Sequence, residues 1–125
     1  MNEVWLPVAG AASGFALVFG TGYWLALVGR PYGAALFAVH KLIGLGMLVY
    51  LGLSAYGFRS AALGRGVWLV VAMAILAFIV VIASGGVLSA VDPAPALASI
   101  LHKVVPYITV VLTAVLMYLQ MSVRR

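Results

Sequence analysis

Four long apolar runs constrain the fold of this chain more than any other feature of its sequence. They extend over residues 4–28, 34–58, 66–91 and 96–123, and their only charged residues are one lysine in the second run and one in the fourth. A helix that crosses a bilayer needs roughly 20 mostly apolar residues. With 66% hydrophobic residues and a mean hydropathy of +1.25, a water-soluble domain of this size could not bury its apolar side chains in one core. The sequence therefore predicts an all-α membrane protein with four transmembrane helices.

The connections between these runs are short, so consecutive helices are expected to be antiparallel neighbours in one up-down bundle covering residues 1–125. Met1-Asn2-Glu3 is not the basic region of a signal peptide, and the first run is long enough to span, so we expect a retained helix. The net charge of +5 lies at helix ends and indicates topology, not nucleic acid as a partner.

The basic residues predict the orientation of the bundle. One face of the predicted bundle carries four arginines, Arg59, Arg65, Arg124 and Arg125. The opposite face carries Arg30, Asp92, Lys41 and Lys103. Because cytoplasmic loops carry an excess of Lys and Arg, we expect a multi-pass protein of the cytoplasmic (inner) membrane with both termini in the cytoplasm.

An internal repeat relates the two halves of the chain. The matching segments are His40-Lys41 with His102-Lys103, Tyr56 with Tyr118, Val4-Trp5-Leu6 with Val67-Trp68-Leu69, and Thr21-Gly22 with Ser84-Gly85. We interpret the chain as two helical hairpins, residues 4–58 and 66–123, related by a pseudo-twofold axis along the membrane normal. Within the first hairpin, Gly10 and Gly14 are spaced for close contact with a neighbouring helix.

The repeat places the only two histidines of the chain at the same depth. His40 lies about six residues inside the second run, or ~9 Å at the rise of an α-helix. The same distance, counted back from the C-terminal ends of the first and third runs, reaches Gly22 and Gly85. The sequence therefore predicts one layer that contains both histidines and both glycines.

This layer suggests a haem site. An ionisable side chain inside a spanning helix is a functional candidate by default. Haem iron accepts two axial imidazoles on opposite sides of its ring, so His40 and His102 are the predicted iron ligands of one haem b per chain. Gly22 and Gly85 would admit the edge of the porphyrin. The chain has no cysteine, which excludes disulfides and thioether-linked haem.

Other residues near this layer fit the same hypothesis. Gly44 follows His40 by one turn and leaves no bulky side chain beneath the imidazole. Lys41, Lys103 and Arg30 could extend toward anionic haem propionates, or could anchor to lipid headgroups. A ligating histidine needs an acceptor for its second ring nitrogen, for which a backbone carbonyl or the hydroxyl of Ser99 is a candidate at His102.

With one histidine in each hairpin, glycines on the intervening helices and four helices in all, the chain resembles the four-helix membrane b-type cytochromes. The resemblance implies bis-histidine haem b and electron exchange with quinol or a redox protein, here near the outer face. Those cytochromes often hold two haems with four histidines. This chain has two histidines, so one haem is the expected limit.

Several alternatives remain open at this stage. The histidines could instead be polar contacts between helices of a cofactor-free subunit or scaffold, either in a larger complex or as a homodimer. A proton-coupled transporter would need a carboxylate inside the membrane, but Glu3 and Asp92 lie outside the apolar runs. A zinc or copper site would need more ligands than two histidines. Since the sequence offers no hydrolytic triad, an electron carrier is favoured over an independent enzyme.

Overall fold

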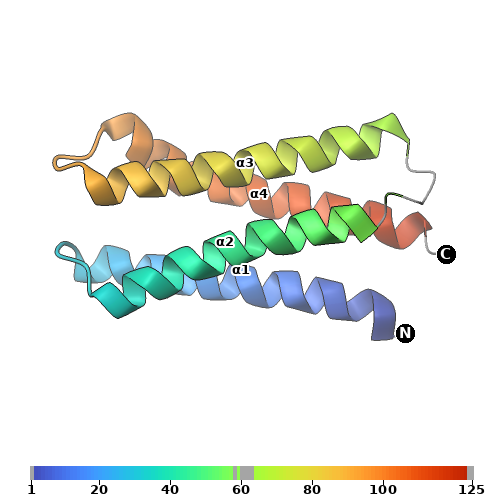
Figure 1. Cartoon of the computed structure of the whole chain (residues 1–125), viewed down its shortest axis with the longest axis horizontal. Coiled ribbons are helices and arrows are strands. Elements are labelled where there is room, and N and C mark those ends of the chain that lie inside the picture. The colour runs from blue at the N-terminus through green and yellow to red at the C-terminus, as the bar shows by residue number, and fades with distance from the viewer. Residues whose placement is uncertain (1, 58, 60–63, 124–125) are drawn as a thin grey trace. The chain divides into compact units, whose positions relative to one another are not determined.

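The computed structural model describes residues 2–57, 59 and 64–123, which form four helices (Figure 1). Helix α1 covers Asn2–Val28, α2 covers Ala34–Gly57, α3 covers Arg65–Ala90 and α4 covers Ala96–Val123. The predicted all-α fold of four spanning helices is confirmed, and each helix is long and apolar enough to cross a membrane. Phe58, Arg124 and Arg125, which belong to the predicted second span and basic C-terminus, lie outside the described residues.

Glycine and proline end the first helix where its apolar run ends. Gly29 adopts a left-handed conformation with φ of 70°, and its N–H donates to the Leu25 carbonyl at 3.0 Å. A residue in this conformation commonly terminates a helix, and glycine adopts it without steric cost. Pro31 then follows, and α2 begins three residues later.

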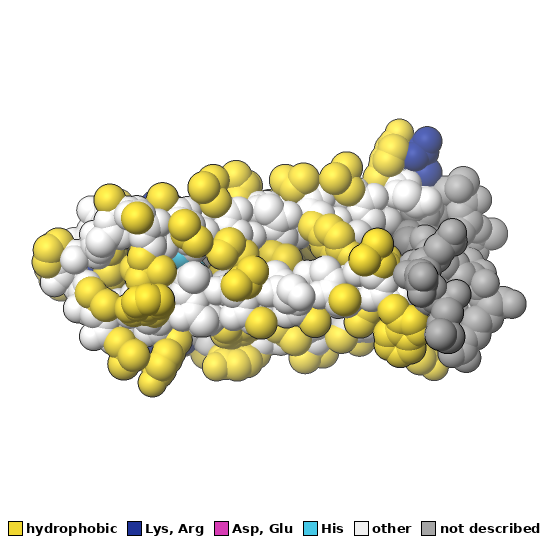
Figure 2. All heavy atoms as spheres, turned by 90° about the horizontal axis from the view of Figure 1, so that it is seen from below, with side chains coloured by type: hydrophobic (Ala, Val, Ile, Leu, Met, Phe, Trp, Pro, Cys, Tyr) yellow, Lys and Arg dark blue, Asp and Glu magenta, His cyan; other side chains and the backbone are white. Residues whose placement is uncertain are grey.

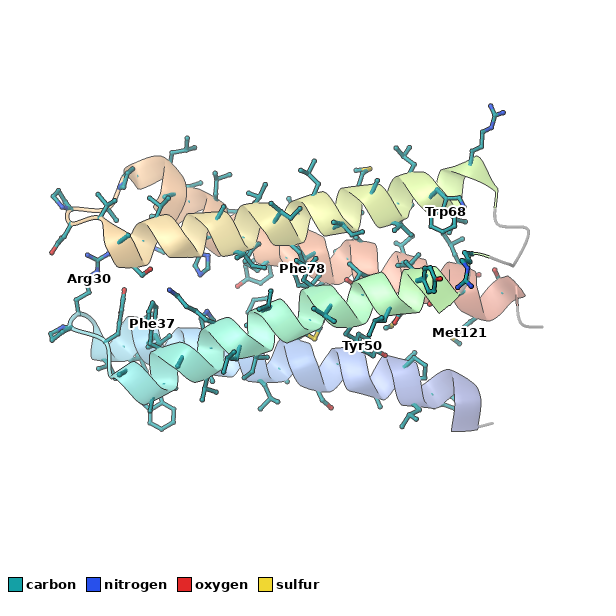
Figure 3. The ribbon with its side chains drawn as sticks, viewed as in Figure 1. Arg30, Phe37, Tyr50, Trp68, Phe78 and Met121 are labelled. Atoms are coloured by element: carbon teal, nitrogen blue, oxygen red, sulfur yellow. The ribbon has the colours of Figure 1, made fainter. Side chains whose placement is uncertain are left out.

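The chain divides into two compact units, Met1–Tyr50 and Leu51–Arg125, so the boundary falls inside α2. In the first unit, α1 and α2 run antiparallel as a hairpin, drawn from blue to green in Figure 1. The hydroxyl of Tyr50, labelled in Figure 3, donates to the Pro7 carbonyl at 2.7 Å and joins α2 to α1. That the chain forms a single domain stays a prediction.

Close contact at two glycines brings α1 and α2 together. A Cβ on Gly10 would lie 3.4 Å from the Tyr50 hydroxyl oxygen, and a Cβ on Gly14 would overlap the sulfur of Met47. The Met47 side chain is buried. The glycine spacing thus serves contact between the helices of one hairpin.

In the second unit, α3 and α4 pack against each other as a hairpin, drawn from yellow to red in Figure 1. The buried side chains of α3 recur on one face of the helix and are Val71, Ala74, Ala77, Phe78 and Ser84. Helix α4 contributes buried Ala98 and a stripe with a spacing of three or four residues, consisting of Thr109, Thr113, Leu116 and Gln120. The buried residues of α3 are thus mostly apolar, while those of α4 are partly polar.

Many large apolar side chains are exposed in the structure. Exposed apolar side chains occur on all four helices, for example Trp24 on α1, Leu53 on α2, Leu69 on α3 and Ile100 on α4. Figure 2 shows apolar side chains spread over the visible face and a basic side chain near one end. Since water does not solvate such a surface favourably, a lipid bilayer must cover it. The protein is a multi-pass membrane protein.

Candidate functional site

His40 lies in the second turn of α2, where its imidazole meets α1. Its Nδ1 atom is 3.0 Å from the Thr21 hydroxyl oxygen. The same hydroxyl donates its proton to the Leu17 carbonyl at 2.8 Å, within its own helix. With its proton directed at the Leu17 carbonyl or at the Val18 carbonyl, 3.2 Å away, the Thr21 oxygen can accept a hydrogen bond from His40 Nδ1–H.

His102 takes the equivalent place on α4 and meets α3. Its Nδ1 atom is 3.0 Å from the Val81 carbonyl oxygen and 3.4 Å from the Ser84 hydroxyl oxygen. A carbonyl oxygen only accepts, so Nδ1 must carry a proton that it donates to Val81. Val81 and Ser84, the two residues beside His102 Nδ1, lie within one turn of each other on α3.

Both hairpins therefore place an acceptor from the neighbouring helix beside Nδ1 of the imidazole. When Nδ1–H donates to this acceptor, the lone pair of a neutral imidazole resides on Nε2. A metal-binding histidine commonly has this arrangement, in which a backbone carbonyl or other acceptor fixes the tautomer and the ring orientation. Both imidazoles are half-buried.

A glycine lies against each imidazole. A Cβ on Gly22 would be 3.0 Å from Cε1 of His40, and a Cβ on Gly85 would be 2.7 Å from Cε1 of His102. Any larger residue would displace the ring at Gly85 and press on it at Gly22. Each histidine thus lies beside one of the two predicted glycines within its own hairpin, and a single layer that contains all four residues stays a prediction.

The basic residues of the first hairpin sit on aromatic faces near the connection between α1 and α2. The Lys41 ammonium is 4.1 Å from the centre of the Phe37 ring, and the Arg30 guanidinium is 5.9 Å from that of Tyr32. The two rings stack on each other with centroids 5.5 Å apart. Figure 3 labels Arg30 and Phe37 at this end of the hairpin. Lys41 therefore extends toward the N-terminal end of α2, as expected for a snorkelling side chain.

The remaining predicted residues make no close contact with these rings. A Cβ on Gly44 would meet no atom within 4 Å. Lys103 is exposed near the start of α4. Their roles beside a cofactor stay predictions.

Three residues lie beside the imidazoles in contacts that the sequence does not predict. The Val81 carbonyl is the backbone acceptor expected for His102, although its residue could not be named in advance. Thr21 and Ser84 were visible only as matched residues in the repeat. A hydroxyl residue directly before each glycine of the layer is the signal that could have identified both.

Among the described residues, no group of three or more His, Cys, Asp or Glu side chains could hold a metal ion. No family model, curated protein or solved structure matches the chain. The two hydrogen-bonded histidines are thus the feature from which a function must be argued.

Proposed function

We propose that this protein is a membrane b-type cytochrome that binds one haem b through His40 and His102. The observation that carries the proposal is the shared environment of the two imidazoles. The Nδ1 atom of each lies beside an acceptor on the neighbouring helix, and each ring rests against a glycine. In both hairpins, Nε2 is then the ring nitrogen that would bind iron.

Haem suits a chain with this donor set. The porphyrin supplies four nitrogens to the iron, so two imidazoles complete its coordination, whereas zinc and copper sites take more ligands from the protein. Gly22 and Gly85 leave the room that the two imidazoles themselves occupy against the neighbouring helices.

Bound haem supplies one-electron exchange, and the protein sets its potential through ligands, burial and charge. His40 and His102 would hold the iron, while the cations Lys41, Lys103 and Arg30 would lie nearest the propionates. Quinol or a redox protein at the outer face of the inner membrane is the proposed electron partner. The protein would act as a carrier or haem-bearing subunit, alone, as a homodimer or with other membrane subunits.

A cofactor-free membrane subunit is the second candidate function. The hydrogen bonds of His40 and His102 to neighbouring helices also satisfy polar side chains inside a bundle, as structural histidines do. Under this alternative the imidazoles join helices and bind nothing further.

Absorption spectroscopy of the detergent-purified protein separates the two candidates. We expect sharp bands on reduction in the parent protein, and near-complete loss of haem in His40→Ala and in His102→Ala, because each removes one axial ligand. Lys41→Ala, which changes the adjacent residue only, should retain the haem. Parent protein without haem after haem-supplemented expression, or equal haem content in both histidine variants and the parent, would contradict the proposal.

A further inference from the structure

The two histidines use acceptors of different chemical kinds. His40 donates to a side-chain hydroxyl, that of Thr21, whereas His102 donates to a main-chain carbonyl, that of Val81. The repeat would allow the same partner in both hairpins, since Thr21 and Ser84 occupy matching positions and both carry hydroxyls. The difference therefore arises from how each imidazole is placed against its neighbouring helix.

Thr21 acts as a relay between His40 and the backbone. Its oxygen lies 3.0 Å from His40 Nδ1, and its hydroxyl can donate to the carbonyl of Leu17 at 2.8 Å or of Val18 at 3.2 Å. Hydrogen bonds in such a chain polarise and strengthen one another. Removing the Thr21 hydroxyl would take away the acceptor that orients His40.

Ser84 and His102 share one acceptor, the Val81 carbonyl. The Ser84 hydroxyl donates to this carbonyl at 3.0 Å, and His102 Nδ1 donates to the same oxygen at 3.0 Å. The distance between Ser84 and His102 is longer, at 3.4 Å. Ser84 thus shares the acceptor of His102 as a competing donor, and its removal would leave the Val81 carbonyl in place.

We propose that Thr21 is the positioning residue for His40, setting its tautomer and its strength as an iron ligand, and that Ser84 has no such role for His102. The part that concerns iron rests on the proposed function. The part that concerns the tautomer does not, because it follows from the hydrogen bonds of the chain itself. The two matched hydroxyls of the repeat therefore serve different purposes.

Thr21→Val and Ser84→Ala form the matched pair that tests this proposal. Valine has the shape of threonine without the hydroxyl, so Thr21→Val removes the acceptor and keeps the packing. Loss of such an outer partner typically weakens metal affinity 10–100-fold. We expect Thr21→Val to lower haem affinity by at least about tenfold, Ser84→Ala to leave it at the parent level, and Thr21→Ser to restore it.

The midpoint potential of the haem tests both the direction and the size of the effect of Thr21 on the iron. An imidazole that no longer donates from Nδ1 is a poorer electron donor to iron, and the ferric form loses more than the ferrous form. The potential should rise in Thr21→Val, where each tenfold change in the ratio of ferric to ferrous affinity corresponds to about 59 mV. In Ser84→Ala it should not rise.

Nitrogen NMR of histidine-labelled full-length chain without haem tests the tautomer separately. We expect His40 Nδ1 to be protonated in the parent and in Thr21→Ser, and to lose this preference in Thr21→Val. His102 Nδ1 should stay protonated in Ser84→Ala. Identical His40 spectra in the parent and Thr21→Val would overturn the proposal. Parent protein that binds no haem but shows the expected spectra would overturn only the proposed function.

Discussion

Gly22 and Gly85 differ in how closely an imidazole approaches them. The contact at Gly85 is the tighter one, because a Cβ there would lie 2.7 Å from Cε1 of His102, below any real carbon contact. The ring cannot move away easily, since Nδ1 is bonded to the Val81 carbonyl on the same helix. At Gly22 the corresponding distance is 3.0 Å, which small adjustments of His40 can accommodate.

Replacement of Gly85 by alanine should therefore displace His102. We expect Gly85→Ala to break the bond to Val81, lower haem content and cost about 1–3 kcal/mol of stability, as overpacking typically does. Unfolding in detergent and the absorption spectrum measure the two effects. The control is Gly86→Ala, which has the same gain in helix propensity but no atom within 4 Å of its Cβ. Equal behaviour of the two variants would argue against a steric role for Gly85.

At the scale of the helices, the two hairpins have residues of different size at matching buried positions of the repeat. In the first, Gly14 on α1 leaves room for the buried Met47 of α2. Offsets of 63 and 62 residues, which match the repeat, carry these positions to Ala77 on α3 and Thr109 on α4, both buried. Ala77 is larger than the matching Gly14, and Thr109 is smaller than the matching Met47. The two differences offset each other, so the total side-chain volume changes little between the hairpins.

This exchange predicts a rescue. Gly14→Ala should destabilise the first hairpin by about 1–3 kcal/mol, because the new methyl group overlaps the Met47 sulfur. Adding Met47→Thr creates the pair of the second hairpin and should recover most of the loss. A double-mutant cycle of unfolding free energies in detergent measures the coupling. Additive effects of the two substitutions would show that the residues do not compensate each other.

For the molecule as a whole, the four spans and the exposed apolar surface require a bilayer, while the charges at helix ends predict its orientation. Arg59 and Arg65 flank the second connection. The positive-inside tendency therefore predicts that this connection lies in the cytoplasm and the first connection outside.

Single cysteines can test this orientation cleanly, because the chain has none of its own. Gly33 and Gly64 are exposed at the ends of the first and second connections. We expect an impermeant thiol reagent to label Gly33→Cys in intact cells, and Gly64→Cys only after the membrane is permeabilised. The reverse pattern would mean that the termini lie outside.

The sequence by itself determined the four helices, because strongly apolar runs of about 25 residues have few other stable structures. It also predicted that His40 and Gly22 lie at one depth, and likewise His102 and Gly85, because a repeat with short connections sets the depth of each residue. Only the tertiary structure decided which atoms hold the imidazoles. A main-chain carbonyl such as that of Val81 belongs to every residue type and leaves no mark in a sequence, and a hydroxyl at position 21 or 84 becomes an acceptor or a competitor only through the placement of the facing ring.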